Sequence, residues 1–436
     1  MIAALLLTAV CSRAQTFGEW FDGRNLRLDY IFAGNSNEQH IFFEQACTTT
    51  QWAGRRNNLA ENPLLCNGRL TMTDHATGKV LYAHVFSTLF QEWVATEEAK
   101  RLKRAFQTSY NVPMPRQQAD VTVTICDFHG QPTAKLTHTI DPHDILIRQL
   151  APNGIPFHYV WQGGSVEQAV DVAIVAEGYT KEQMPKFNTD CQRVVDALFA
   201  REPFSSLKSR FNVVAVETIS DAEGPSIPRQ HRWNNTPAMT HYDTFYSERY
   251  LTTQHMHRLY DLLSGVPFEH IIVLVNSSTY GGGGIFNQLL VTTSDHPTFS
   301  EVLVHEFGHS YAGLADEYDY GENSENIYPA DIEPWEPNLT TLYDFETKWA
   351  DLLPAGTAIP TPLEELPDYR RLTTDAQRKQ LNDATQRVGV FEGGGYQAHG
   401  VYRPAQVCRM RINQVADFCP VCTRAIRRIT DYYIGR

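Results

Sequence analysis

The most informative segment of the sequence is Val302-Leu-Val-His305-Glu306-Phe-Gly-His309-Ser-Tyr-Ala-Gly313-Leu-Ala-Asp316-Glu317-Tyr318. Its first part has apolar residues at helical spacing, which predicts an amphipathic helix packed against a core. Thr298 and Glu301 have the spacing of a capping box and predict where this helix begins. Gly313 accepts a left-handed conformation and predicts where it ends.

The two histidines of this helix are placed for metal chemistry. His305 and His309 are four residues apart, so their imidazoles share one face about one turn from each other. Zn²⁺ suits neutral imidazole, and a catalytic zinc takes three protein ligands and lowers the pKa of a water at its fourth position. A neighbouring carboxylate accepts the proton of that water as it attacks a carbonyl. The pattern therefore predicts His305 and His309 as zinc ligands and Glu306 as the general base.

The residues after the helix supply candidates for a third ligand. Beyond Gly313 the chain can turn back and bring Asp316 or Glu317 under the histidines. The alternative is a surface helix with two ordinary histidines. The glycine end and the carboxylates that follow it favour the metal site over that alternative.

The motif resembles that of the metzincin metallopeptidases, His-Glu-x-x-His-x-x-Gly-x-x-His/Asp. It departs from that pattern by one residue, because Gly313 comes four and Asp316 comes seven positions after His309. This variant, with its Gly-Leu-Ala-Asp-Glu-Tyr end, resembles the bacterial IgA-peptidase family of zinc metallopeptidases. The resemblance implies Asp316 as the third ligand, with Glu317 as its main rival. The other of the two is expected to orient a histidine or close the turn.

The resemblance also assigns roles near the C-terminus. Metzincins carry a methionine on a tight turn beneath the zinc, and Met410 resembles it in position. Some of them place a tyrosine two residues later, where it stabilises the oxyanion, but this sequence has Ile412 there. Tyr318, Tyr402, Arg411 or a backbone N–H would have to take that part, and the sequence does not choose among them.

Length and charge limit the other functional classes. A chain of 436 residues has room for two domains or one large one. Its net charge of −13 argues against nucleic acid and anionic membranes as partners. The expected partner is a polypeptide or glycoprotein substrate.

The first residues predict export. Residues 1–14 form an apolar run that ends in a small-x-small pattern, which indicates a secretory signal peptide cleaved before Gln15. The run lacks a positively charged beginning and is too short to span a bilayer. Lipidation at Cys11 is the lesser alternative, since Val10 fits poorly before a lipidated cysteine. The expected location is therefore secreted, periplasmic or at the cell surface, and no other segment is predicted to be transmembrane.

Seven cysteines remain without Cys11, an odd number that leaves at least one free or paired between chains. Cys47 and Cys66 are one possible pair. Near the C-terminus Cys419-Pro-Val-Cys422 has the spacing of a redox centre or half a zinc knuckle, but no second such pair exists in the sequence. A structural disulfide to Cys408 is the favoured interpretation, with the connectivity left open.

Short alternating or apolar runs separated by turns predict that residues 15–158 form a β-sandwich domain. One short helix is conceivable within residues 96–106. The strands are expected at residues 25–32, 68–73, 79–86, 119–127 and 135–140.

Residues 151–164 are rich in Pro and Gly and mark the domain boundary. In the second domain, 165–436, a buried strand at 170–179, a helix at 181–199 and a strand at 210–217 predict a parallel β-α-β unit. Another strand is expected at 268–276, and further helices near 374–387 and 418–432. Glu177, on the first of these strands, is expected to anchor a loop.

Tyr280 and the glycine run at 281–284 lead into a strand expected at 285–293, just before the metal helix. In metzincins this strand is the antiparallel edge that pairs with an extended peptide, a form of β-augmentation. The alternative is a hairpin whose glycines make the turn. The acidic segment 319–326 could bind Ca²⁺, but nothing in the sequence supports this over a solvated loop.

The sequence thus predicts a two-domain protein of the α+β/α/β class. An N-terminal β-sandwich precedes a metzincin-like zinc peptidase domain with a mixed twisted sheet and an active-site helix. The expected function is that of a secreted zinc metalloendopeptidase with ligands His305, His309 and Asp316 and the base Glu306. One alternative is a non-catalytic protein that binds a cell-surface or host glycoprotein through a degenerate peptidase domain. Another is a zinc hydrolase of non-peptide amides, for which a small closed pocket would be expected.

Overall fold

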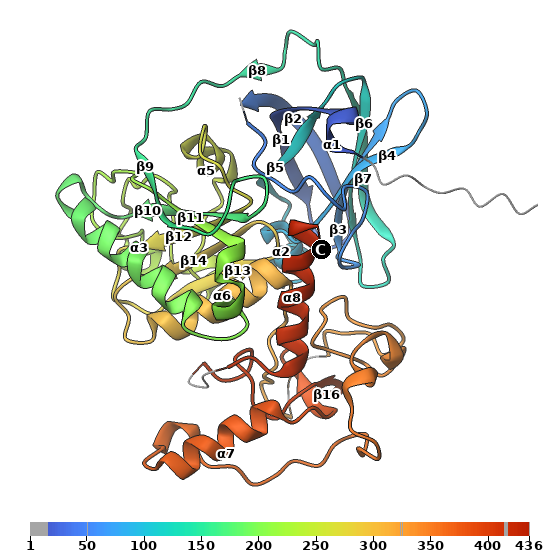
Figure 1. Ribbon diagram of the computed structural model, residues 1–436, viewed down its shortest axis with the longest axis vertical. Helices are drawn as coiled ribbons and strands as arrows, with labels where there is room; N and C mark the ends of the chain where they lie inside the picture. The colour runs from blue at the N-terminus through green and yellow to red at the C-terminus, as the bar shows by residue number, and fades with distance from the viewer. Residues whose placement is uncertain (1–15, 50, 323, 325, 414–416, 436) are drawn as a thin grey trace, which may run out of the picture.

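The computed structural model describes residues 16–49, 51–322, 324, 326–413 and 417–435. The expected signal peptide at residues 1–14, including Cys11, lies outside these described residues. An N-terminal domain made mainly of strands is followed by a domain that mixes strands and helices (Figure 1). Within the described ranges, no helix is long and apolar enough to cross a membrane.

The N-terminal domain contains two four-stranded sheets. The first has the order β5-β1-β2-β8 and consists of β1 (Phe21–Gly34), β2 (Gln39–Thr49), β5 (Arg104–Pro115) and β8 (Arg148–Gln149). The second has the order β4-β3-β6-β7 and consists of β3 (Gly68–Asp74), β4 (Val80–Phe86), β6 (Ala119–Cys126) and β7 (Pro132–Ile140). All neighbours are antiparallel except β2 and β8, which are parallel. Three short helices accompany the sheets: α1 (Phe17–Trp20), α2 (Leu89–Val94) and the 3-10 helix η1 (Glu98–Lys100).

The two sheets share apolar side chains. On β3, Leu70 and Met72 are buried and the residues between them are half-buried, as the two-residue period of a strand requires. Leu28 and Tyr30 of β1 belong to the same hydrophobic cluster as this pair. Side chains from both sheets therefore form one core.

The short helix considered for residues 96–106 is wrong. That stretch contains only η1 and the beginning of β5, whose Phe106 and Tyr110 are buried in the domain core. Pairing of β5 with β1 outweighs the local helix preference of the preceding residues. The helix of this region is α2, where the side chain of Thr88 accepts a hydrogen bond from the backbone N–H of Gln91.

The second domain is built on a six-stranded sheet with the order β13-β14-β12-β10-β11-β9. The four inner strands are parallel, and the two edge strands run antiparallel to their neighbours. The parallel pairing of β10 with β11 confirms the predicted β-α-β unit. The strands are β9 (Phe157–Gln162), β10 (Val170–Glu177), β11 (Phe211–Val216), β12 (His270–Val275), β13 (Gly282–Ile285) and β14 (Leu289–Thr293).

The two faces of this sheet pack against different partners. Val172 and Ile174 of β10 belong to a hydrophobic cluster that also contains residues of three helices, α3 (Met184–Phe199), α6 (Phe299–Ala312) and α8 (Pro420–Ile434). Ala173 and Val175 belong instead to the cluster of the N-terminal domain. Alternation along the strand thus places the sheet between its helices and the first domain.

The remaining elements are short or lie toward the C-terminus. The expected helix near 374–387 is confirmed as α7 (Asp375–Gln386), capped by Thr374 and Gln377. A hairpin of β15 (Phe391–Gly394) and β16 (Gln397–Arg403) follows it. The others are α4 (Phe204–Leu207), α5 (Met256–Leu262) and the 3-10 helices η2 (Lys181–Gln183), η3 (Lys208–Arg210), η4 (Pro228–Gln230), η5 (Thr244–Tyr246), η6 (Phe345–Thr347), η7 (Ala350–Leu352) and η8 (Tyr369–Arg371).

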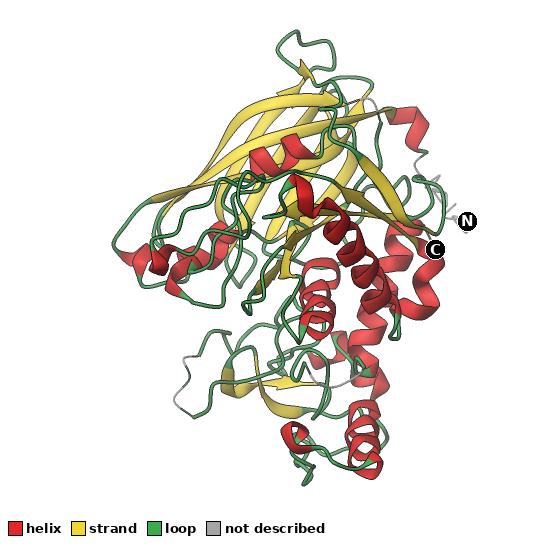
Figure 2. Cartoon of the chain, turned by 90° about the vertical axis from the view of Figure 1, so that its left-hand side faces the viewer, coloured by secondary structure: helices red, strands yellow, loops and turns green. Residues whose placement is uncertain are grey.

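Helix α8 connects distant parts of the molecule. Figures 1 and 2 place α7 and the β15–β16 hairpin at the end of the molecule opposite the N-terminal sheets, and α8 runs between the two ends. At its C-terminal end the side chain of Asn58 donates to the carbonyl of Tyr432 at 2.9 Å, and the hydroxyl of Tyr432 donates to the carbonyl of Glu61 at 2.9 Å. Hydrogen bonds therefore connect the C-terminal end of α8 to the first domain.

Candidate functional site

Helix α6 carries the His-Glu-x-x-His pattern within the predicted bounds. It begins after Thr298 and ends at Gly313, whose φ of 63° is the expected left-handed conformation. The capping box is wrong in detail, because the Thr298 side chain makes no hydrogen bond to the first turn and lies 2.8 Å from Nδ1 of His296. The predicted bounds hold because proline, threonine and glycine stop the helix at both ends through backbone geometry.

The two imidazoles converge on one point. Nε2 of His305 lies 3.0 Å from Nε2 of His309, with the rings nearly perpendicular at 85°. Each Nδ1–H donates to a backbone carbonyl, His305 to Arg409 at 3.1 Å and His309 to Leu314 at 2.6 Å. Such bonds fix the tautomer and leave both Nε2 lone pairs free for a metal ion.

Asp316 joins the histidines. Its Oδ1 lies 3.0 Å from Nε2 of His305 and 3.4 Å from Nε2 of His309. This oxygen is buried and makes no hydrogen bond of normal geometry, whereas Oδ2 accepts one from the hydroxyl of Tyr396. Glu317, the rival candidate, points away into a cluster of cysteines. The geometry therefore favours Asp316 over Glu317.

The donor set fits a zinc ion. Metal–ligand distances of about 2.0–2.2 Å in tetrahedral geometry separate the ligand atoms by roughly 3.4 Å. The three atoms of this cluster lie 3.0–3.4 Å apart. Oδ1 of Asp316 faces both imidazoles without a hydrogen bond of normal geometry, an arrangement that leaves its lone pairs available to a metal ion. His305, His309 and Asp316 could therefore hold a metal ion, although their role as ligands stays a prediction.

The charges of this cluster oppose one another. Burial would lower the pKa of His309, but the neighbouring Asp316 carboxylate outweighs it and raises this pKa to about 9. Burial would likewise raise the pKa of Asp316, but His309 and His305 hold it well below its usual range. Without a metal, His309 is therefore protonated at neutral pH, and its positive charge faces the ionised carboxylate of Asp316. A metal ion would have to replace that proton.

Glu306 lies beside the cluster and lines the cleft. Burial raises its pKa, with His305 and His309 opposing this and Asp316 adding to it. A raised pKa suits a group that accepts a proton and later returns it. Glu306 is thus placed for the predicted base, but that role stays a prediction.

A cleft of about 1260 Å³ opens over the cluster. Its wall includes β13, the loop before it and residues of the segment after α6. Glu92 of the N-terminal domain also lines it and accepts a hydrogen bond from the hydroxyl of Tyr250. Both domains therefore contribute to the cleft.

The glycine run forms the sheet edge itself. β13 is the outermost strand, and β14, directly before α6, lies inside the sheet, so the edge expected at residues 285–293 is shifted to Gly282–Ile285. The turn of this hairpin falls at residues 286–288, so the alternative in which the glycines make the turn is also wrong. A Cβ on Gly284 would lie 2.5 Å from the carbonyl oxygen of Glu306 and 3.0 Å from Cβ of His309. The glycines thus allow the edge strand to approach the metal helix closely.

Met410, the methionine singled out by the resemblance, packs against α6. It is fully buried, and its Sδ would lie 2.8 Å from a Cβ on Gly308, so it packs directly against α6 between the two histidines. Of the oxyanion candidates, Tyr318 and Arg411 line the cleft, whereas Tyr402 does not. Ile412 lines the cleft as well.

Several cleft residues were missed by the sequence interpretation: Glu92, Arg249, Tyr250, Tyr280 and Tyr396. Tyr396 bonds Asp316 from a hairpin eighty positions later in the chain. No local signal marks such a tyrosine, although its flanking Gly-Gly-Gly-Tyr stretch indicates a tight turn.

Glu177 is the loop anchor that was expected. Its carboxylate accepts hydrogen bonds from the hydroxyl of Thr236, from the N–H of Ala238 and from both the N–H and the hydroxyl of Thr240, at 2.6–2.8 Å. It is fully buried and holds the loop at residues 236–240 against the sheet.

Two family models match the chain. The model described as IgA Peptidase M64 matches residues 160–430, and the model described as Peptidase M64 N-terminus matches residues 16–137. No curated protein matches the chain. The first model covers strands β10 to β14, helix α6 and the cluster of His305, His309 and Asp316, and a peptidase acting on polypeptides is what this family supports. The chain belongs to the IgA peptidase M64 family.

Proposed function

We propose that this protein is an exported, zinc-dependent metalloendopeptidase that cuts extended polypeptides or glycoproteins. The observation that carries the proposal is the convergence of Nε2 of His305, Nε2 of His309 and Oδ1 of Asp316, with Glu306 beside them in an open cleft. A zinc ion held by these three atoms would polarise the scissile carbonyl and make water acidic enough to react at neutral pH.

Other residues of the chain would orient the ligands and transfer the proton. The carbonyls of Arg409 and Leu314 keep both imidazoles in the ligating tautomer. The hydroxyl of Tyr396 orients Asp316. Glu306 accepts the proton of the attacking water and returns it to the leaving nitrogen of the substrate.

The cleft supports a polypeptide substrate. It is open, and the sheet edge β13 lines it beside Glu306. An extended chain can pair with such an edge through its backbone, which allows many sequences to bind. A hydrolase of non-peptide amides is expected to have a small closed pocket, so the open cleft favours a peptidase over that class of enzyme.

The proposal also includes the fold family of each domain and the export of the protein. We assign the N-terminal domain to the β-sandwiches because its two sheets share one core. We assign the second domain to a metzincin-like fold because of its antiparallel edge strand, the turn at Gly313 and Met410 beneath the histidines. Export rests on the apolar run at residues 1–14, with lipidation at Cys11 as the lesser alternative.

The test is cleavage of a denatured protein mixture by the purified chain, with and without a chelator, followed by mass mapping of the cut sites. Chelation should stop cleavage, and zinc should restore it. Glu306→Gln should lower the rate by at least about 10³-fold and leave the zinc content unchanged. Glu301→Gln, on the first turn of the same helix, is the matched control and should retain activity.

Two results would contradict the proposal. One is full activity in Glu306→Gln, and the other is zinc lost from that variant but retained in His305→Ala. A protein that binds glycoproteins without cutting any polypeptide would instead support the non-catalytic alternative.

A further inference from the structure

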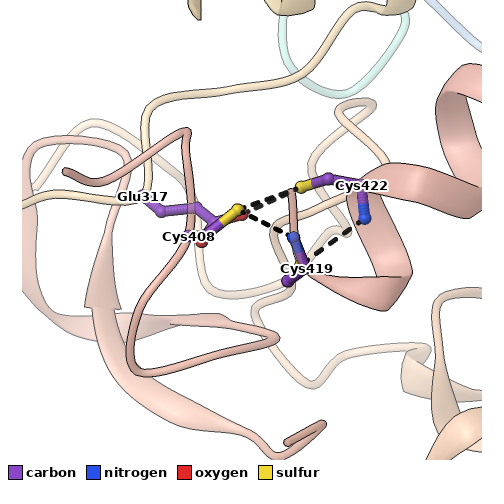
Figure 3. A group of neighbouring side chains, drawn as sticks. All are labelled: Glu317, Cys408, Cys419 and Cys422. Atoms are coloured by element: carbon purple, nitrogen blue, oxygen red, sulfur yellow. Dashed lines mark hydrogen bonds between the residues drawn. The ribbon is translucent and has the colours of Figure 1, made fainter. Parts of the chain in front are cut away.

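A second cluster of side chains that could hold a metal ion lies next to the candidate active site, since one of its members, Glu317, directly follows Asp316. It consists of Glu317, Cys408, Cys419 and Cys422, shown in Figure 3. All four are fully buried, and their ligand atoms lie within 4.8 Å of one another. They come from three separate stretches: the segment after α6, the turn that carries Met410, and the first turn of α8.

One sulfur–sulfur distance matches metal coordination, and the other ligand atoms lie close enough to share the same ion. Sγ of Cys408 lies 3.8 Å from Sγ of Cys422. Two thiolates bound to one zinc at about 2.3 Å in tetrahedral geometry are separated by roughly 3.8 Å, whereas a disulfide requires about 2.05 Å. The disulfide expected from the sequence is therefore not formed, and all seven cysteines of the described chain are free thiols. One disulfide would in any case leave the third sulfur outside the bond and Oε2 of Glu317 without a hydrogen-bond partner.

The carboxylate is the second observation that points to a cation. Oε1 of Glu317 lies 3.1 Å from Sγ of Cys422 and accepts a hydrogen bond from Asn338 at 3.0 Å. Oε2 has no hydrogen-bond partner, and the residue is 0% exposed. Among the ion pairs of the described residues, none involves Glu317. Arg403 acts on this carboxylate electrostatically but forms no direct ion pair with it. A buried carboxylate without a direct ion pair is costly, and a bound metal ion would lower that cost.

The backbone around the sulfurs favours thiolates. The N–H of Cys419 points to Sγ of Cys408 at 3.4 Å, and the N–H of Cys422 points to Sγ of Cys419 at 3.5 Å. Cys419 is also the N-cap of α8, where the partial positive charge of the helix end stabilises an anionic sulfur. Pro420 at the first helical position fixes the turn without needing a hydrogen bond of its own.

We propose that Cys408, Cys419, Cys422 and Glu317 bind a second zinc ion with a structural role. Three thiolates and one carboxylate complete a tetrahedron, so no position is left for water or substrate. The inference does not rest on the proposed peptidase activity, because it concerns different side chains. Soft thiolate ligands also exclude the calcium and magnesium classes of site.

The location of this second site explains what it would stabilise. The N–H of Glu317 donates to the carbonyl of Met410 at 2.8 Å, so the two segments that carry the ligands are already paired. Asp316 precedes one ligand directly, and Arg409, whose carbonyl orients His305, follows another. The second zinc would therefore hold the base of the active site in one arrangement.

The first test is metal analysis of the purified full chain. Wild type should contain about two zinc ions per chain, and His305→Ala/His309→Ala should retain about one. A wild type that never exceeds about one, together with none in the double histidine variant, would overturn the proposal. Cys191→Ala is the matched control, because Cys191 is a fully buried thiol outside the cluster and its loss should leave the zinc content unchanged.

The second test identifies the ligands without depending on cysteine variants that fail to fold. Cobalt bound to the double histidine variant should show intense sulfur-to-metal charge-transfer absorption in the near ultraviolet. Its absence would overturn the proposal, and so would a disulfide among the three cysteines found by non-reducing mass mapping. If metal analysis of the native protein finds one iron ion at the cysteine cluster and no zinc there, the assignment of the metal as zinc is wrong.

The third test addresses the carboxylate. Glu317→Gln should weaken zinc binding at the second site by about 10- to 100-fold, measured by competition with a chelator in the double histidine background. Glu333→Gln is the matched control, since Glu333 also has a buried oxygen without a partner but lies outside both clusters. Equal affinity in Glu317→Gln and Glu333→Gln would remove Glu317 from the ligand set.

Discussion

Asp316 and Glu317 are neighbours in the chain, yet their carboxylates face two separate clusters. Oδ1 of Asp316 lies 3.0 Å from Nε2 of His305, and Oε1 of Glu317 lies 3.1 Å from Sγ of Cys422. A single peptide unit therefore joins the candidate active site to the cysteine cluster. The sequence left Asp316 and Glu317 as rivals for one ligand position, and the structure places them in different clusters.

Asp316→Asn should lower zinc affinity at the histidine site by at least about 100-fold, because a neutral amide replaces a charged ligand. Peptidase activity should fall with it at limiting zinc. The measurement is zinc titration against a competing chelator. Asp319→Asn is the control, since Asp319 lines the same cleft but lies outside both metal clusters. Equal losses in the two variants would argue against Asp316 as a ligand.

Tyr396→Phe should weaken zinc binding about tenfold while the fold is retained. The phenol holds Oδ2 of Asp316, and a ligand that loses such an orienting bond binds its metal less tightly. Zinc titration and a thermal melt together separate this effect from unfolding. Tyr402→Phe, which lies outside the cleft, should behave like wild type. If Tyr396→Phe binds zinc as tightly as wild type, the hydrogen bond from Tyr396 to Asp316 is not needed for zinc binding.

Gly284→Ala should destabilise the protein by about 1–3 kcal/mol and reduce cleavage. The added Cβ would lie 2.5 Å from the carbonyl oxygen of Glu306, so β13 or α6 must shift. The free energy of unfolding and the rate of cleavage are the two measurements. Gly18→Ala is the control because a Cβ there meets nothing within 4 Å. If the two alanine variants are equally stable, β13 is not tightly packed on α6.

Asp171→Asn should change stability in a pH-dependent way. Burial raises the pKa of Asp171 to about 7, against 3.8 when exposed, and its Oδ2 has no hydrogen-bond partner. Between about pH 4 and pH 7, Asp171 keeps its proton in the folded chain and loses it in the unfolded chain. The free energy of unfolding therefore falls as pH rises through this range and stays low above it. The variant should therefore be more stable than wild type by on the order of 2 kcal/mol at pH 8, with the gain disappearing toward pH 4.

Unfolding by denaturant at several pH values measures this difference. Asp196→Asn, which replaces an exposed carboxylate, should change stability by less than about 0.5 kcal/mol at every pH. A gain for Asp171→Asn that is independent of pH would mean that the buried carboxyl is not the titrating group.

Local patterns predicted the parts of the site that lie close together in sequence. The four-residue spacing of His305 and His309 placed both rings on one face, and Gly313 marked the end of the helix. The resemblance then favoured Asp316, and the structure brings it to the histidines. These residues lie within one helix and the turn after it, so local backbone geometry brings them close together before distant segments add their bonds.

Contacts between distant segments could not be predicted. Tyr396 reaches Asp316 from a hairpin, and Glu92 reaches the cleft from the other domain. The glycines of β13 were expected to precede the edge strand, but their lack of side chains allows them to form it. The cysteines were expected to form a disulfide because the sequence does not reveal that Glu317 lies among them.

Helix α8 gives the molecule a dependence on the order of synthesis. It begins at Pro420, directly after Cys419 of the cysteine cluster, and near its end at Ile434 the carbonyl of Tyr432 accepts a hydrogen bond from Asn58 of the first domain. His305 and His309 are synthesised before α8, so a growing chain lacks the support of this helix at the candidate active site until α8 has been made. We therefore expect a product that stops before α8 to bind metal less tightly than the chain that includes it.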